Sequence, residues 1–433
     1  MSTITLTGSA TSAKHDTPIE EQIRNLIIET KSGVKDTPGL SEANVYGPDP
    51  EGLKLLPESA RKRFAESGID ISKGYPERPN KSDVPVYVDE AYQVRNQDYP
   101  YVERAKNADP EKKALFSAAT EVKHLTRSIG TEIVGLQLED LTDQQKDELA
   151  LLVAERCVVF FRDQKLTPQK QLELGRYWGQ VEEHPQTPHV PGYPGITSIW
   201  VDYRRKKGLN LTFENNNWVG FNRSFGSGGG NQVWHTDLVH EHQPAGITHL
   251  HNDTIPEVGG DTCWLNGYAA YDKLSPELRK FLDGKQAIYH SAHAYIDRND
   301  PFSGPKNVER AHPLIRTHPA TGWKSLFVNR GMTRRIVGLN PVESDLILNF
   351  LFDLCEKNYD IQCRFNWKPS KPGYGTSAIW DNRVSQHKVV WDHEGTEPRH
   401  GTRVTSLAEV PYFDKNSKTQ REALGLPINN TFN

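Results

Sequence analysis

The stretch Trp234-His235-Thr236-Asp237 decides how this sequence is interpreted. In an extended strand, side chains two residues apart point to the same face, so a strand here would place His235 and Asp237 side by side. One imidazole and one carboxylate are two of the three ligands of the two-histidine, one-carboxylate iron site. Alone the triplet is a weak signal, because histidines more often satisfy structural hydrogen bonds.

A second histidine from a distant part of the chain would complete such a site. The segment 380–387, Trp-Asp-Asn-Arg-Val-Ser-Gln-His, follows a predicted strand and ends in His387, and Arg399 and Arg403 come after it. A guanidinium binds a carboxylate through two parallel N–H donors. It therefore suits the far carboxylate of a 2-oxo acid whose other end chelates a metal. Together these residues indicate a metal site beside a site for a dicarboxylic acid.

Short runs of β-branched and aromatic residues recur around these segments, with turn residues between them. Strands are predicted at 130–138, 157–162, 197–201, 247–251, 262–265, 287–290, 325–328, 378–380 and 404–410. Helices are predicted at 142–152, 168–178, 267–274, 276–282 and 342–358. The pattern predicts a mostly β fold with flanking helices, built on a double-stranded β-helix (jelly-roll, cupin-like) core.

The chain divides into three predicted parts. Residues 1–110 read as an extended, partly irregular N-terminal arm, with helical periodicity only near 19–30 and 59–66. Residues 111–415 form the predicted β-helix domain, and 416–433 a C-terminal tail. The arm wraps either the main domain or a second subunit, so a homo-oligomer is one of the open alternatives.

Charge and hydropathy narrow the classes of partner. Lys and Arg number 52 against 56 Asp and Glu, giving a net charge of −4, so no basic excess exists to neutralise nucleic-acid phosphates. No apolar run reaches the roughly 18–20 residues of a membrane span. Residues 1–17 are rich in Ser and Thr and lack an apolar signal core. We therefore expect a cytoplasmic protein that binds a small molecule, without nucleic acid or membrane.

A set of short motifs, taken together, is more specific than any one of them. They are Gly130 in the entry strand, Val158-Val-Phe-Phe-Arg-Asp-Gln164, Trp234–Asp237, Gly259-Gly-Asp-Thr262 and the segment 380–387. From about residue 126 to 410 the chain resembles the taurine/2,4-D dioxygenase family, in particular its fungal sulfonate-dioxygenase-like branch.

The resemblance implies a role for eight residues. Iron(II) would be held by His235, Asp237 and His387, 2-oxoglutarate by Thr262 and Arg399, and the acid group of the substrate by His184, Asn231 and Arg403. The spacing from His387 to Arg399 is one residue longer than is usual in the family. That insertion leaves open whether Arg399 or Arg403 anchors 2-oxoglutarate. Other histidines, among them His240 and His293, are assigned no role.

The reaction that the resemblance implies uses Fe(II), 2-oxoglutarate and O2. It would hydroxylate a small organic acid, in the first place a sulfonate, giving aldehyde and sulfite with succinate and CO2. Thr187 replaces an aromatic residue of taurine-type members, and 210–231 is an enlarged Asn- and Gly-rich loop, so taurine itself is disfavoured.

Several alternatives stay open. The same chemistry would also act on an aryloxyacetate, a purine or an amino-acid-derived metabolite, by hydroxylation, desaturation or cleavage. A zinc hydrolase uses similar ligands but needs a general base that the sequence does not supply. A non-catalytic jelly-roll binding module predicts a broken metal triad, whereas this one is complete.

Overall fold

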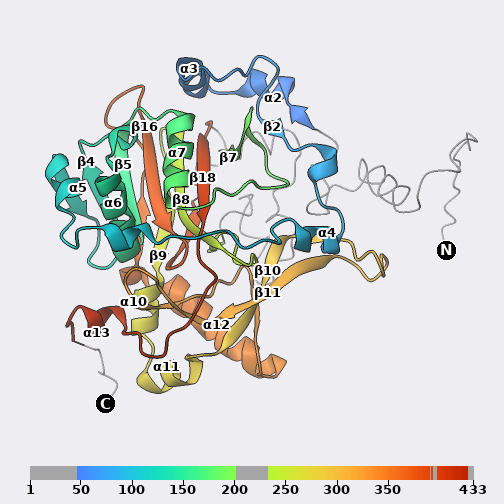
Figure 1. The fold of residues 1–433 in the computed structure, drawn as a ribbon, viewed down its shortest axis with the longest axis vertical. Helices are drawn as coiled ribbons and strands as arrows, with labels where there is room; N and C mark the ends of the chain where they lie inside the picture. Colours follow the sequence, from blue (N-terminus) through green and yellow to red (C-terminus); the bar gives the residue numbers. More distant parts are fainter. Residues whose placement is uncertain (1–45, 201–232, 391, 394–396, 428–433) are drawn as a thin grey trace, which may run out of the picture.

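Antiparallel strands dominate the structure, a computed structural model that describes residues 46–200, 233–390, 392–393 and 397–427. A ten-stranded sheet forms one wall and three smaller sheets lie beside it (Figure 1). In order, the large sheet contains β1 (Gly47–Pro48), β2 (Glu77–Arg78), β6 (His189–Val190), β7 (Tyr193–Ile199), β18 (His400–Leu407), β8 (Ala245–Thr254), β16 (Gly375–Asp381), β5 (Val158–Gln164), β4 (Thr131–Val134) and β3 (Glu121–His124).

The smaller sheets supply the opposite side of the β-helix. They contain β15 (Gln362–Phe365), β9 (Thr262–Asn266) and β17 (Ser385–Val389), then β11 (Lys306–Pro313), β10 (Gln286–Tyr295) and β14 (Thr333–Ile336), and lastly β12 (Ile315–Thr317) and β13 (Lys324–Leu326). Strands that follow one another along the chain lie in different sheets. Strands β8, β16 and β18 lie in the large sheet, whereas β9 and β17 pair in a small one. This alternation confirms the predicted jelly-roll, cupin-like fold.

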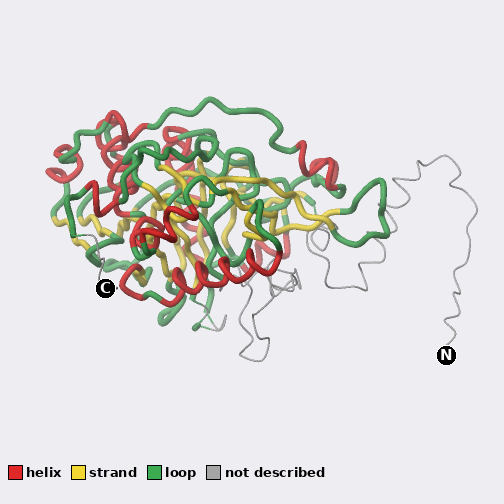
Figure 2. Tube along the Cα trace, turned by 90° about the horizontal axis from the view of Figure 1, so that it is seen from below, coloured by secondary structure: helices red, strands yellow, loops and turns green. Residues whose placement is uncertain are grey.

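Helices lie on the outside of the strands (Figure 2). They are α2 (Pro50–Leu55), α3 (Glu58–Glu66), α4 (Val88–Gln93), α5 (Lys113–Ala118), α6 (Asp143–Arg156), α7 (Pro168–Trp178), α10 (Gly267–Asp272), α11 (Pro276–Leu282), α12 (Pro341–Lys357) and α13 (Gln420–Ala423), with short 3₁₀ turns at Lys81–Asp83, Arg104–Asn107, Leu138–Asp140 and Tyr359–Ile361. Helices α6 and α7 pack on the large sheet. Among the described residues, no helix is both long and apolar enough to cross a membrane.

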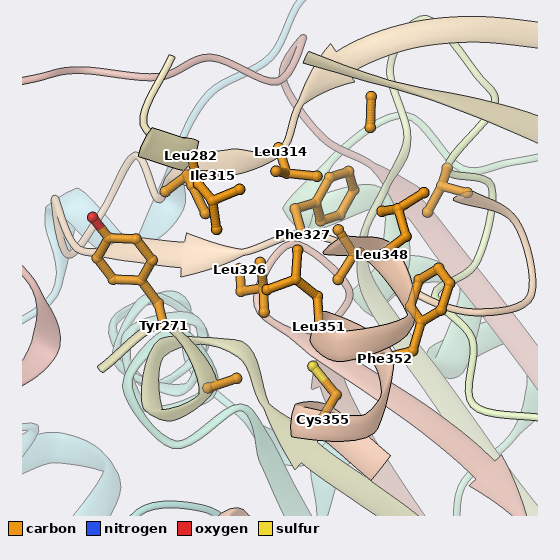
Figure 3. Packing of buried hydrophobic residues seen from close by; sticks show 14 of the residues in the cluster. Tyr271, Leu282, Leu314, Ile315, Leu326, Phe327, Leu348, Leu351, Phe352 and Cys355 are labelled. Atoms are coloured by element: carbon orange, nitrogen blue, oxygen red, sulfur yellow. The ribbon is translucent and has the colours of Figure 1, made fainter. Parts of the chain in front are cut away.

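Helix α12 closes a second core on the other side of the molecule. Leu348, Leu351, Phe352 and Cys355 recur at helical spacing, so one face of the helix is apolar and buried. Figure 3 shows these side chains packed against residues of β12 and β13, including Leu326. The helix therefore holds the small sheets in place from outside.

The N-terminal residues 46–118 are joined to the main domain rather than separate from it. Strand β2 pairs with β6 at the edge of the large sheet, and α3, which confirms the predicted helix near 59–66, packs on β8. Two buried ion pairs fix this segment: Arg63 with Asp253 at 3.2 Å and Arg95 with Glu182 at 2.6 Å. Beyond α4 the chain crosses the front of the molecule to α5 (Figure 1). The predicted boundaries at 110 and 415 stay predictions.

A capping box begins α6, the helix that covers β5. The Thr142 side chain accepts a hydrogen bond from the Gln145 backbone N–H, and the Gln145 side chain accepts from the Thr142 N–H at 2.9 Å. We expect Thr142→Ala to lower the free energy of unfolding by about 1 kcal/mol, because the Gln145 backbone N–H loses its acceptor. Urea denaturation followed by circular dichroism measures this loss. Ser117→Ala, at an exposed position of α5, is the control and should change little.

Candidate active site

His235 and His387 are brought together by backbone pairing. His387 lies on β17, and the two residues form an isolated antiparallel bridge, with N–H to carbonyl distances of 3.1 and 2.9 Å. Their ring centroids are 4.3 Å apart. Residues 152 positions apart in the chain thus face each other across one bridge, which is why sequence proximity alone could not pair them.

Asp237 completes the cluster from a turn rather than from a strand. The extended conformation considered for 234–237 does not continue to Asp237, because the chain turns from this residue onward and Leu238 takes a φ of 57°. The turn still aims the carboxylate at the histidines, at 3.8 Å from His235 Nε2 and 4.0 Å from His387 Nε2. The three ligand atoms all lie within 4.8 Å of one another, and this is the one such cluster among the described residues.

Burial sets the charges of this cluster. It lowers the pKa of His387 to about 3, and the neighbouring His235 lowers it further than Asp237 raises it. Burial likewise lowers the pKa of His235. For Asp237 burial works the other way, yet Arg403 and the two histidines lower its pKa overall. At neutral pH the site therefore holds two neutral imidazoles and one carboxylate, the protonation states in which these groups bind metals.

The donor set fits a metal of the two-histidine, one-carboxylate class. The His235 Nδ1 lies 2.9 Å from the Val233 carbonyl oxygen, so it carries the proton and leaves the Nε2 lone pair for a ligand. Arg403 Nη1 lies 3.3 Å from both oxygens of Asp237, so a cation already balances the carboxylate here. A metal ion would take over that balancing charge.

Thr262 and Arg399 meet on the neighbouring side of the same cavity. Arg399 is 3 % exposed, and its Nη2 lies 3.5 Å from Thr262 Oγ1, while its Nε donates to the Gly260 carbonyl at 3.2 Å. Trp367 Nε1 donates to Thr262 Oγ1 at 3.0 Å. Gly260 has a φ of 72°, and a Cβ there would lie 3.5 Å from Arg399 Cδ and only 2.9 Å from Pro256. The turn at position 260 therefore requires glycine, because of its left-handed φ and its close approach to Pro256.

One cavity of about 200 Å³ joins these groups between the large sheet and the β9–β17 pair. Seven of the eight predicted residues line it: His184, His235, Asp237, Thr262, His387, Arg399 and Arg403. The eighth, Asn231, lies outside the described residues. A larger cavity of about 600 Å³ between α10 and α13 contains none of the predicted residues, so we place the candidate site in the smaller one.

Further residues of the cavity wall were missed by sequence reasoning. His240 and His293, which we had assigned no role, line the cavity together with Trp200 and Met332. The His293 ring centroid is 5.3 Å from that of His184. His293 lies on β10, Trp200 directly follows β7, and His240 and Met332 lie in turns, so no local spacing in the sequence marks them as neighbours.

Comparison with known proteins identifies the family. A family model described as taurine catabolism dioxygenase TauD, TfdA family, matches residues 121–405. The chain belongs to this family. The TauD/TfdA match runs from β3 into β18, so it contains the three residues of the candidate metal site and both Arg399 and Arg403. The match confirms the resemblance that the motifs indicated.

Relatives and solved structures agree with that assignment. An alpha-ketoglutarate-dependent sulfonate dioxygenase of Saccharomyces cerevisiae is 36% identical over 326 residues, covering 73% of this chain and 74% of that protein. The alpha-ketoglutarate-dependent dioxygenase cnsM of Penicillium expansum is also 36% identical, over 314 residues, covering 70% of this chain and 82% of that protein. A crystal structure of a taurine dioxygenase from Burkholderia xenovorans superimposes with a TM-score of 0.54 at 29% identity, covering 68% of this chain and 91% of that chain.

Membership of the TauD/TfdA family makes this protein a dioxygenase, an oxidoreductase. It also implies that the enzyme uses 2-oxoglutarate and O2.

Proposed function

We propose that this dioxygenase uses Fe(II) held by His235, Asp237 and His387 to hydroxylate a small organic acid, and that the acid is a sulfonate. The observation that carries the proposal is the convergence of those three side chains, from two distant parts of the chain, within 4.8 Å. When bound there, iron supplies activation of O2 coupled to decarboxylation of 2-oxoglutarate to succinate and CO2.

Arg399 and Thr262 are proposed to bind the 2-oxoglutarate. The Arg399 guanidinium is buried, planar and permanently charged, which suits the far carboxylate of a dicarboxylic acid. The Thr262 hydroxyl already accepts a hydrogen bond from Trp367, so it is free to donate its own proton to a carboxylate oxygen. Trp367 holds the Thr262 side chain and the Gly260 carbonyl holds that of Arg399, so the cosubstrate would be bound in one orientation.

His184 and Arg403 are proposed to hold the acid group of the prime substrate, with Asn231. The Nδ1 of His184 accepts from the backbone N–H groups of Gln186 and Thr187, at 3.1 Å each. Burial, together with the nearby His293 and cationic arginines, holds the pKa of His184 well below its usual value. The ring is therefore neutral with its proton on Nε2, which makes it a hydrogen-bond donor rather than a cation. One such donor and one guanidinium suit the oxygens of a singly charged sulfonate.

A sulfonate is favoured by the name of the S. cerevisiae relative, whereas the P. expansum relative of equal identity carries no sulfonate in its name. Hydroxylation of the carbon next to a sulfonate gives an adduct that breaks down to an aldehyde and sulfite. The competing proposal within this family is a non-sulfonate acid, from which no sulfite would be released.

A substrate panel separates these proposals. Purified full-length protein with Fe(II), O2 and 2-oxoglutarate is incubated with alkyl sulfonates of different length, taurine, aryloxyacetates and purines. Succinate reports turnover and sulfite reports the sulfonate reaction. Succinate with equimolar sulfite supports the proposal, while succinate that depends on a carboxylate or purine alone overturns the sulfonate assignment. Hydrolysis with zinc and no succinate would overturn the oxygenase proposal itself.

His184→Ala is expected to weaken the binding of the prime substrate selectively. A hydrogen bond to a charged group contributes roughly 1.5–3 kcal/mol, so the half-saturating substrate concentration should rise about 10- to 100-fold. Succinate formed without prime substrate should persist, because His184 is not among the proposed 2-oxoglutarate ligands. Steady-state assays of both activities measure this split.

His189→Ala is the matched control, since His189 lies nearby on β6 and does not line the cavity. His189→Ala should leave the half-saturating concentration of the prime substrate, and the succinate formed without it, near the wild-type values. An unchanged substrate requirement in His184→Ala would remove His184 from the acid-binding site.

A further inference from the structure

Tyr75 belongs to the N-terminal segment, outside the residues that match the family model, yet it is fully buried in the main domain. Its hydroxyl donates to Ser198 Oγ at 2.9 Å and lies 2.7 Å from His400 Nε2. Its ring centroid is 6.0 Å from that of Trp200. Tyr75 itself does not line the cavity, whereas Ser198 and Trp200 do.

His400 directly follows Arg399 and is held from both sides. Its Nδ1 lies 2.7 Å from Asp253 Oδ1. Burial raises the pKa of Asp253, but His400 and Arg63 outweigh this effect and lower it overall, so Asp253 is ionised and accepts a hydrogen bond from His400 Nδ1–H. Asp253, His400, Tyr75 and Ser198 thus form one continuous buried chain of hydrogen bonds.

A β-bulge explains why the chain of hydrogen bonds begins at Asp253. His400 pairs with Thr254 and Gly401 with Asn252, so β8 has one extra residue, Asp253. A bulge redirects the side chain of the extra residue, here toward the His400 ring. Gly401 has no alternative, since a Cβ there would lie 2.3 Å from the side-chain oxygen of Asn252. The backbone at the start of β18 is therefore fixed immediately beside Arg399.

We propose that Tyr75 is a positioning residue for the cosubstrate site: by fixing His400 against Ser198, it holds Arg399 in the orientation that binds 2-oxoglutarate. The N-terminal segment then adds support to a site whose other contacts lie within the family domain. The inference rests on the proposed role of Arg399. Loss of the hydroxyl would leave two buried polar groups, Ser198 Oγ and His400 Nε2, without this partner, and β18 would shift to satisfy them.

Tyr75→Phe tests the proposal because it keeps the ring and removes only the hydroxyl. The probe is 2-oxoglutarate itself, titrated by calorimetry into full-length protein loaded with Mn(II), so the readout does not depend on turnover. The dissociation constant for 2-oxoglutarate should rise about tenfold, the size typical of lost support behind a ligand. The affinity for Mn(II) should stay unchanged.

Tyr193→Phe is the matched control, a tyrosine on β7 whose hydroxyl accepts from Gln169 Nε2. It should bind 2-oxoglutarate as the wild type does. Asp253→Asn breaks the same chain at its other end and should weaken 2-oxoglutarate in the same direction; it also tests the proposal should Tyr75→Phe fail to fold.

A double-mutant cycle separates positioning from general loss of structure. If Tyr75 acts through Arg399, its effect should shrink in an Arg399→Lys background, whereas a merely structural effect adds to it. Wild-type protein that binds no 2-oxoglutarate would overturn the proposed function, and this inference with it. If the wild type binds 2-oxoglutarate tightly and neither Tyr75→Phe nor Asp253→Asn changes that affinity, the inference about Tyr75 is overturned while the proposed function stands.

Discussion

Replacing Asp237 with alanine should abolish iron binding and succinate formation. Asp237 is the one carboxylate of the cluster, and it lies within about 4 Å of both histidine Nε2 atoms. Removing it leaves two neutral imidazoles and the positive charge of Arg403, which repels a metal ion. Mutation of residues that only support a metal ligand already lowers metal affinity roughly 10- to 100-fold. Loss of the ligand itself should therefore lower the affinity for iron by more than that. Anaerobic titration with Fe(II), followed by chelator competition, measures the affinity.

The controls separate loss of metal from loss of fold. Asp237→Asn keeps the size of the side chain and removes its charge, so it should also fail to bind iron while folding normally. Asp345→Ala removes an exposed carboxylate on α12, far from the cluster, and should bind iron like the wild type. Far-ultraviolet circular dichroism should be the same for all variants. Turnover retained in folded Asp237→Ala protein would refute the metal assignment.

Helix ends were predictable wherever local chemistry defines them. Helices α7 and α11 begin and end at the predicted residues, because Thr167 and Ser275 accept hydrogen bonds from their first turns and proline occupies the first helical position of each. The same local rules place the start of α6 at Thr142. Such signals act within a few residues and do not require a partner from a distant part of the chain.

Strands that depend on distant partners were harder to predict. Strand β17, Ser385–Val389, is Ser-Gln-His-Lys-Val and has little β-branched character, so no strand was predicted around His387. It is extended because β9 pairs with it along its whole length. Strand β11, which includes Lys306, Glu309 and Arg310, was missed for the same reason and is held by β10. Tertiary pairing, rather than local preference, decides these segments.

The candidate site divides in a similar way. His235, Asp237 and His387 could be named from their motifs, because ligand chemistry restricts the residue types. The wall residues His240 and His293 and the supporting Tyr75 could not, since each is near the cavity only through the fold. A histidine or tyrosine in a linear sequence has no feature that distinguishes a wall position from a core position.

Replacing Arg399 with alanine should raise the 2-oxoglutarate requirement strongly, whereas Arg403→Ala should chiefly affect the prime substrate. The two arginines lie four residues apart but have different neighbours: Arg399 is beside Thr262 and Gly260, and Arg403 is beside Asp237. Truncating one partner of a buried charge pair costs about 2–5 kcal/mol, which corresponds to an increase of at least about 30-fold in the half-saturating concentration.

Measuring both half-saturating concentrations in both variants gives a crossed pattern that identifies each arginine. Arg399→Lys keeps the charge but loses the two-pronged donor geometry, so it should fall between the wild type and Arg399→Ala. Arg335→Ala, an exposed arginine paired with Glu309, should change neither constant. If the pattern is reversed, the extra residue before Arg399 has shifted the register, and Arg403 is the 2-oxoglutarate anchor. Because Tyr75 is proposed to act through Arg399, that reversal would also remove the proposed link between Tyr75 and 2-oxoglutarate binding.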